Sequence, residues 1–322
     1  MTLSRRTFAT GAGALVFAPS IGRAAEPLVI GAVPANAVHW VQCVAHEKGF
    51  YREVGFTSEL QQIQSSPQSM QMAITGGYQI ATSQPDTFLA AHSRGATQLA
   101  ALASPTNHND WVLVGAPDVK RLEDLQGKTI GLSSLRGSEA WATSRLLDEK
   151  GVKRDAYNYV VSGVSPAKVA ALTRGAIGAA VLFEPSAEVA LRQGLPALAN
   201  YGGMRSYPTV VYVVNTDWAR KGDAGKRAGA ALKKAHAWMW DRANQKECEA
   251  ILAKYTKRDA SICETIYKRY FIDAELYSKT GAVDVEGMRT VIADMAEDGA
   301  VFTKAPDVRS VLLDPALGGL AT

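Results

Sequence analysis

Cysteine and long apolar runs are both scarce in this chain of 322 residues. Its three cysteines are an odd number without paired spacing, which argues against zinc and iron–sulfur sites. Cys248 and Cys263 fall on neighbouring expected helices, so they either form a disulfide in an oxidising compartment or stay as buried thiols. Cys43 falls in the apolar pattern of the first expected helix and is predicted to lie in the core.

Excess charge of one sign is also missing. The chain has 35 basic and 31 acidic residues and a formal net charge of +4. Three of the arginines stand near the N-terminus, in a stretch of the sequence that contains no acid. Elsewhere lysine and arginine are mixed with aspartate and glutamate along helical segments, which indicates solvated helix faces rather than a surface for nucleic acid.

The common catalytic motifs are absent. The sequence contains no Gly-x-Ser-x-Gly elbow, no His-Glu-x-x-His metal site and no complete phosphate-binding loop. A hydrolase assembled from scattered histidine, serine and aspartate residues is the remaining enzymatic alternative. The sequence therefore predicts no catalytic residue, no cofactor and no metal, and the chain is expected not to be an enzyme.

The N-terminus has the pattern of an export signal. Ser4-Arg5-Arg6-Thr7-Phe8 matches the twin-arginine pattern, a mostly apolar stretch runs from Ala9 to Ala18, and Gly22-Arg23-Ala24 offers small residues for cleavage. The apolar stretch is too short to span a bilayer. Residues 1–24 are therefore expected to be a signal peptide, and the mature protein is expected to be periplasmic after export by the twin-arginine route.

What the sequence does contain is an internal repeat with an offset of about a hundred residues. Five landmarks recur in the same order: Ile30-Gly31 and Ile130-Gly131, Glu47-Lys48-Gly49 and Glu149-Lys150-Gly151, Ser66-Pro67 and Ser165-Pro166, Gly76 and Gly175, Pro85 and Pro185. Each copy has the order of a βαβαβ unit, which implies parallel strands. The repeat predicts two similar lobes, with a solute held between them by the strand-end loops of both.

The repeat divides the mature chain into three segments. Residues 25–109 are predicted to begin lobe 1, residues 110–208 to form lobe 2, and residues 209–322 to return to lobe 1 as one strand and a helical tail. Two isolated apolar strands, Trp111–Gly115 and Thr209–Val214, are expected to cross between the lobes as a hinge.

An anion-binding loop is predicted between a strand and a helix of lobe 2. It gathers hydroxyls, a glycine and a guanidinium at a helix N-terminus, where N–H groups attract negative charge and an arginine can bind a carboxylate or sulfonate through two hydrogen bonds. The alternative is ordinary helix capping with a surface arginine. The candidate residues are Ser133, Ser134, Arg136, Gly137 and Ser138.

The equivalent loop of lobe 1 supplies facing candidates. Asn36, His39 and Trp40 follow the first strand. The last two offer a donor and a stacking surface, unless they form a structurally satisfied pair in the core. Glu184 is expected either to contact the solute or Arg136, or to cap the helix that follows it. The candidates that end other strands or border the hinge are Ser65, Ser66, Gln84, Asp86, Asn109, Glu184 and Tyr207.

Five short motifs carry a resemblance to a known family. They are Ala45-His46-Glu47-Lys48-Gly49-Phe50-Tyr51 with Gly55, Ala73-Ile74-Thr75-Gly76-Gly77-Tyr78, Leu125-Gln126-Gly127-Lys128-Thr129-Ile130-Gly131, Gly137-Ser138 and Phe183-Glu184-Pro185. With them the chain resembles the nitrate, sulfonate and taurine type of periplasmic solute-binding protein, a group that includes binders of thiamine pyrimidine precursors. The chain departs from the family at Gln79 and Gly178, where aspartate is usual, and at Phe183, where tryptophan is frequent.

The resemblance implies an α/β protein with the two-lobed periplasmic-binding-protein fold of type II. Each lobe would be a mostly parallel sheet flanked by helices, and two crossing hinge strands would join the lobes. Ligand contacts would lie in the loop from Ser133 to Ser138 and at Glu184.

The implied function is that of a monomeric receptor that delivers a small solute to the membrane permease of an ABC importer, without nucleic acid or cofactor. Arg136 favours an organic anion, a sulfonate or a carboxylate, as the solute. The alternatives are a neutral heterocycle such as a thiamine pyrimidine precursor, an enzyme acting on such a compound, and a sensor domain. Some relatives of this fold that make a thiamine pyrimidine use a cysteine-rich iron motif, which this sequence lacks.

Overall fold

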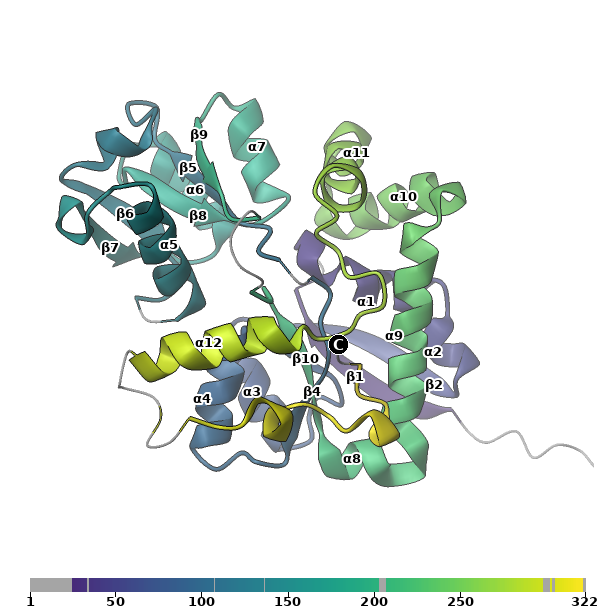
Figure 1. Cartoon of the computed structure of the whole chain (residues 1–322). Helices are drawn as coiled ribbons and strands as arrows, with labels where there is room; N and C mark the ends of the chain where they lie inside the picture. Colours follow the sequence, from purple (N-terminus) through teal and green to yellow (C-terminus); the bar gives the residue numbers. More distant parts are fainter. Residues whose placement is uncertain are drawn as a thin grey trace, which may run out of the picture.

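The computed structural model describes residues 25–33, 35–106, 108–135, 137–202, 207–297, 302 and 305–320. The expected signal peptide and Arg136 lie outside this part of the chain. Figure 1 shows two groups of elements, one built around β5 to β9 and the other around β1, β2, β4 and β10. Within the described ranges, no helix is both long and apolar enough to cross a membrane.

Lobe 1 begins with a parallel strand pair. β1 and β2 align from Glu26 beside Phe56 to Ala32 beside Gln62. The Ser65 side chain accepts a hydrogen bond from a backbone N–H in the first turn of α3, and Pro67 stands where its missing N–H costs no bond. The elements are β1 (Glu26–Ala32), α1 (Trp40–Glu47), α2 (Phe50–Glu53), β2 (Phe56–Gln62), α3 (Ser66–Ile74), β3 (Ala81–Ser83), α4 (Pro85–Ser93) and β4 (Leu99–Ala103).

Lobe 2 contains one five-stranded sheet in the order β7-β6-β8-β5-β9. β6 pairs in parallel with β7 and β8, whereas β5 is antiparallel to β8 and β9. The elements are β5 (Val112–Gly115), β6 (Lys128–Leu132), α5 (Ser138–Glu149), β7 (Tyr157–Val161), α6 (Ser165–Thr173), β8 (Ala179–Leu182), α7 (Ser186–Arg192) and β9 (Ala197–Asn200).

The chain then returns to lobe 1 and ends in a helical tail. β10 (Val211–Asn215) lies between β3 and β4 and is antiparallel to both. Apolar side chains of the tail helices share one core with β1 and α1, so the tail packs on lobe 1. The tail contains α8 (Thr216–Arg220), α9 (Ala224–Trp240), α10 (Gln245–Thr256), α11 (Ala260–Lys268), a π-helix (Arg269–Asp273) and α12 (Val285–Glu297).

Three details correct or extend the sequence prediction. The apolar strands expected to cross between the lobes do not cross, because β5 lies within the sheet of lobe 2 and β10 within that of lobe 1. The antiparallel pairs of these two strands make the sheets mixed rather than mostly parallel. The sequence pattern also does not reveal β4, because Leu99–Ala103 is rich in alanine and lacks the β-branched residues typical of strands.

The cysteines settle one of the open alternatives. Cys43, Cys248 and Cys263 are all buried and free, so the disulfide alternative is wrong and the core position of Cys43 is confirmed. Burial raises the pKa of all three thiols above the ordinary range, which keeps them protonated and unreactive at neutral pH.

Candidate functional site

A cavity of about 500 Å³ lies between the two lobes, and we call it the cleft. Its walls are the loops after β1, β2 and β3 of lobe 1 and after β6, β7 and β8 of lobe 2. These are the carboxyl ends of the strands, where folds built from βαβ units hold their ligands. The polar lining residues are Asn36, His39, Gln64, Ser65, Ser66, Thr82, Ser83, Gln84, Asp86, Thr87, Ser133 and Ser134.

Several helices begin at the cleft because each follows a strand that ends there. The first residues of α3 and α4 line it from lobe 1, and Val164, which precedes α6, lines it from lobe 2. The N-terminus of α5 lies beside it, where Ser138 contacts Asp86. A helix N-terminus carries partial positive charge and unpaired N–H groups. These N-termini give the cleft partial positive charge, while its described lining residues include the Asp86 carboxylate and no lysine or arginine.

The polar side chains of lobe 1 present donors to the cleft. The oxygens of Ser65, Ser66 and Asn36 already accept backbone hydrogen bonds from Gln68, Gln84 and Val38, at 3.3, 3.2 and 3.1 Å. Each bond occupies an acceptor and leaves the hydroxyl or amide hydrogens able to donate. These side chains therefore present hydrogen-bond donors to the acceptor groups of a solute.

His39 contributes a neutral imidazole to the cleft. The residue is only 3% exposed, and burial lowers its pKa to about 3, so the ring is uncharged at physiological pH. Its Nδ1 has no hydrogen-bond partner among the described residues. This nitrogen is itself buried, so it is an unsatisfied polar atom within the cavity wall.

His39 also makes stability depend on pH. The unfolded chain takes up a proton at this residue below about pH 6.5, whereas the folded protein resists protonation until about pH 3. His39 is therefore expected to lower the unfolding free energy by about 1.4 kcal/mol for each pH unit lost between these values. We expect the unfolding free energy, measured by urea denaturation from pH 4 to 7, to change less with pH in His39→Asn than in the wild type.

A second buried histidine serves as the comparison for this measurement. Burial lowers the pKa of His236 to about 4, so it contributes a similar dependence of stability on pH although it does not line the cleft. His236→Asn should reduce the slope by a comparable amount. An unchanged slope in His39→Asn would show that this imidazole is protonated in the folded protein.

A buried ion pair shapes the Ser133 loop. Glu139 of α5 accepts hydrogen bonds from the backbone N–H and the hydroxyl of Ser133, both at 2.7 Å. Lys168 of α6 donates to Glu139 at 2.9 Å and also to the Ser133 hydroxyl and the Val181 carbonyl, both at 3.0 Å. Neither charged side chain is more than 3% exposed. The pair fixes Ser133 and leaves Ser134 at the cleft wall.

Asp86 connects the two lobes at one end of the cleft. The Ser138 hydroxyl at the start of α5 donates to its Oδ1 at 2.8 Å. Burial raises the pKa of Asp86, and the hydrogen bond from Ser138 acts in the opposite direction. Gly137 is required beside this contact, because its φ is +128° and an added Cβ would lie 2.3 Å from Asp86 Oδ2.

Comparison with known proteins adds the family. The model of the family described as NMT1/THI5 like matches residues 36–246. The chain belongs to this family. The putative binding protein YtlA of Bacillus subtilis is 22% identical over 234 residues, which are 70% of each chain.

Solved structures show which fold the NMT1/THI5-like chain has. The periplasmic aliphatic sulphonate binding protein SsuA of Escherichia coli matches with a TM-score of 0.69 and 19% identity, over 90% of this chain and 92% of that one. The periplasmic nitrate-binding protein NrtA of Synechocystis PCC 6803 matches with a TM-score of 0.74 and 14% identity, over 91% and 86%. The periplasmic-binding-protein fold and the family resemblance predicted from the sequence are thereby confirmed.

The structure brings eight of the predicted site residues of this family member to the cleft. They are Asn36, His39, Ser65, Ser66, Gln84, Asp86, Ser133 and Ser134. Gly137 and Ser138 lie next to it, in the contact between α5 and Asp86. No group of histidine, cysteine, aspartate and glutamate in the described ranges is arranged to hold a metal ion.

Trp40 and Glu184 have structural roles instead. The Trp40 ring is buried beside Tyr267 and Phe271, and its indole N–H donates to the Cys248 carbonyl at 3.0 Å, so it offers no stacking surface to a solute. Glu184 accepts a hydrogen bond from the backbone N–H of Glu188, which is the capping alternative. The partner of its other oxygen is Arg269 of the tail.

Asn109 and Tyr207 lie inside the protein rather than at the cleft wall. Both are at most 5% exposed, and neither lines the cavity. The Thr209 hydroxyl contacts the Asn109 side chain at 3.4 Å, and burial raises the pKa of the Tyr207 hydroxyl. The polar residues that border the lobe connections are therefore packed in the interior, and the expectation of solute contact there is corrected.

Sequence reasoning missed part of the lobe 2 wall. Gly163 and Val164 line the cleft after β7 although no motif marks them. The internal repeat contains the missing signal, because it aligns Ser165-Pro166 with Ser66-Pro67 and so places Val164 opposite Ser65. Extending the repeat to every strand end would have predicted both residues.

Proposed function

We propose that this protein is a solute-binding component of an ABC importer that captures a small organic anion, a sulfonate or carboxylate, in the cleft. The observation that carries the proposal is that helix N-termini meet at the cleft together with the side chains of Asn36, Ser65 and Ser66. The oxygens of these side chains already accept backbone hydrogen bonds, so their hydrogens remain free to donate. Such a site supplies hydrogen-bond donors and positive potential. The name of the E. coli structure, an aliphatic sulphonate binding protein, is in line with this solute class.

Binding without chemistry fits the described lining better than catalysis. The carboxylate of Asp86 is engaged with Ser138, and the hydroxyl of Ser133 is engaged with Glu139 and Lys168. The remaining groups donate hydrogen bonds but are not arranged as a nucleophile and its base. A solute held by both lobes would stabilise their closed arrangement, which the permease would then recognise. We further propose that the chain is monomeric and works in the periplasm after export by the twin-arginine route.

A neutral heterocycle is the second candidate solute. The observation in its favour is that the described lining holds the uncharged imidazole of His39 and no cationic side chain. Arg136 decides between the two candidates, because it is the one cation that the sequence places in the cleft loops.

Thermal-shift measurements on the mature chain test the proposed function. The panel contains ethanesulfonate, taurine, aliphatic and aromatic carboxylates, nitrate and neutral pyrimidines. A true solute at a hundred times its Kd is expected to stabilise the protein by about 2.7 kcal/mol. Ser66→Ala should weaken anion binding about tenfold, since a hydrogen bond to a charged group is lost.

Two further variants complete this experiment. Arg136→Ala should abolish the stabilisation by the anion, and Thr173→Ala, at the exposed end of α6, should leave it unchanged. If neutral pyrimidines alone stabilise the protein and Arg136→Ala does not affect them, the anion proposal is wrong and the second candidate takes its place.

A further inference from the structure

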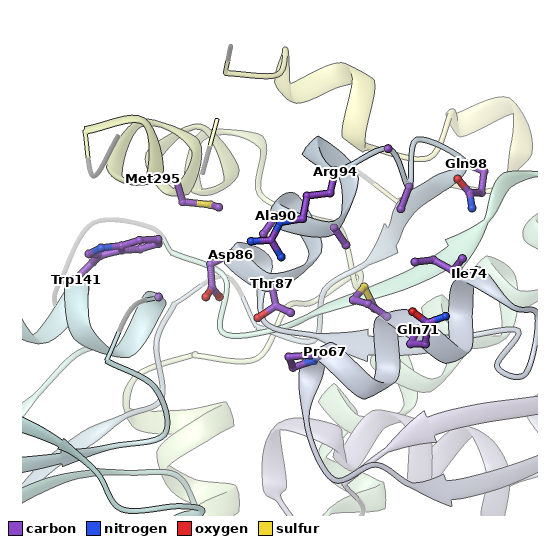
Figure 2. A pocket seen from close by; sticks show the side chains of 15 residues that line it. Pro67, Gln71, Ile74, Asp86, Thr87, Ala90, Arg94, Gln98, Trp141 and Met295 are labelled. Carbon is purple, nitrogen blue, oxygen red and sulfur yellow. The ribbon is translucent and has the colours of Figure 1, made fainter. Parts of the chain in front are cut away.

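A second and larger cavity, of about 620 Å³, lies next to the cleft. It runs between α3 and α4 and is bordered by α5 of lobe 2 and α12 of the tail. Figure 2 shows Trp141 and Met295 together at one side, Ile74 and Gln98 at the other, and Asp86 and Thr87 between them. We call this cavity the α3/α4 groove.

Each of the two helices presents one regular face to the groove. The α3 face contains Met70 and Ile74, and the α4 face contains Thr87, Ala90 and Ala91. Residues three and four apart share one side of a helix, so the groove follows both helices along their length. The two alanines are partly exposed, and their small side chains keep the groove wide.

Two further elements supply apolar wall residues, α5 through Trp141 and α12 through Met295. Trp141 reaches from lobe 2 and packs against the apolar cluster of lobe 1 that contains Met70 and Met295. Methionine and tryptophan side chains present adaptable apolar surface. Among the described lining residues Arg94, exposed at the far end of α4, is the only cation, and Gln71, Thr87 and Gln98 add uncharged polar groups. The side of the groove formed by Met70, Trp141 and Met295 is suited to a hydrocarbon chain.

The groove and the cleft share wall residues at the N-termini of α3 and α4. Pro67, Asp86 and Thr87 line both cavities. The charge of Asp86 at this junction is partly offset by the Ser138 hydroxyl that donates to it. Each helix has nine residues, so the groove extends about 13 Å from the junction.

We propose that the α3/α4 groove binds the apolar chain of an amphipathic anion whose head group lies in the cleft. This inference rests on the proposed function, since it requires an anionic head at the helix N-termini. It narrows the solute class from small anions in general to alkyl sulfonates or carboxylates with a chain of several carbons. The chain would lie over Ala90 and Ala91, against Met70 and Trp141.

Chain length gives the expected signature. Each methylene that moves from water into an apolar groove is expected to tighten binding about fourfold. Calorimetric titration with linear 1-alkanesulfonates from ethane to octane should therefore show affinity that rises with chain length and then levels off when the groove is filled. The emission of Trp141 should shift with the long chains only, and Trp141→Phe should remove this shift.

Filling the groove provides the decisive variant. Ala90→Leu is expected to remove the gain with chain length while leaving ethanesulfonate affinity within about twofold. Ala170→Leu, an equivalent change at an exposed position on α6, should preserve the full series. Circular dichroism establishes that each variant is folded. The emission shift of the wild type reports chain binding without any substitution in the groove.

The possible failures are distinct. If ethanesulfonate and octanesulfonate bind the wild type equally, or if folded Ala90→Leu keeps the chain-length series, the groove does not hold the chain, although the proposed function stands. If no alkanesulfonate or carboxylate of any length binds, both the proposed function and this inference are wrong.

Discussion

Replacing Lys168 with methionine is expected to lower the unfolding free energy by about 3–5 kcal/mol. Methionine has a side chain of similar length to lysine but carries no charge, so the substitution leaves the Glu139 carboxylate buried without its cation. An uncompensated buried charge costs far more than the pair itself contributes to stability. Because Lys168 also bonds Ser133, the cleft loop should loosen and solute affinity should fall with stability.

Urea denaturation at neutral pH measures this effect. The double variant Lys168→Met, Glu139→Gln should recover part of the loss, since it removes both charges and keeps an acceptor for Ser133. Lys128→Met is the matched control, because Lys128 pairs with Asp118 where both side chains are at least 41% exposed, and it should cost under about 1 kcal/mol. A loss in Lys168→Met no larger than in Lys128→Met would contradict the prediction.

Arg269→Met is expected to lower the unfolding free energy by about 3 kcal/mol and to separate the lobes. Its guanidinium binds Glu184 and Glu188 of lobe 2, with a distance of 3.0 Å to Glu188, while the π-helix that carries it belongs to the tail on lobe 1. The Glu184 side chain is fully buried, so losing this arginine leaves its carboxylate without a compensating cation.

Small-angle scattering and denaturation together measure both effects. The radius of gyration should increase in Arg269→Met relative to the wild type. Arg192→Met tests the same interface, in which Arg192 reaches Ser261 and Thr265 of α11 from α7, with a side chain 41% exposed. It should cost less than half as much. Equal effects of the two substitutions would mean that the burial of Glu184 is not decisive.

The features of the fold and of the site that depend on residues close together in the sequence could be predicted. The repeat gives the parallel units of both lobes because each strand, helix and glycine is encoded within about a hundred residues. Ser65 and Ser66 before Pro67 identify a helix start at a strand end, and the structure has it at the cleft wall. Such features depend on short-range capping and on hydrophobic periodicity, which a sequence shows directly.

The other half depends on contacts between distant segments. Glu184 reads as a solute contact until Arg269, 85 residues further on, is placed beside it. Trp40 reads as a stacking surface until the tail covers it and the Cys248 carbonyl accepts its N–H. For both side chains the sequence leaves a solute contact and a structural role open, because the environment that decides between them is set by how the tail folds over lobe 1.

The α3/α4 groove illustrates the same limit at a surface. Met70, Ile74, Ala90 and Ala91 have ordinary amphipathic spacing, which predicts a buried face. The structure leaves these faces apart because β3 and β10 hold the two helices on one sheet while Trp141 arrives from the other lobe. Whether the apolar face of a helix is covered or left open depends on the distance between neighbouring elements, and the sequence of the helix alone does not show that distance.

The position of β10 has a consequence for synthesis. This strand pairs with β3 and β4 on either side, although more than a hundred residues separate it from both in the chain. On the ribosome, the three-stranded sheet therefore lacks its centre until the whole of lobe 2 has been translated. Lobe 2 can complete its five strands first, and the nascent lobe 1 must wait with two open edges for its final strand.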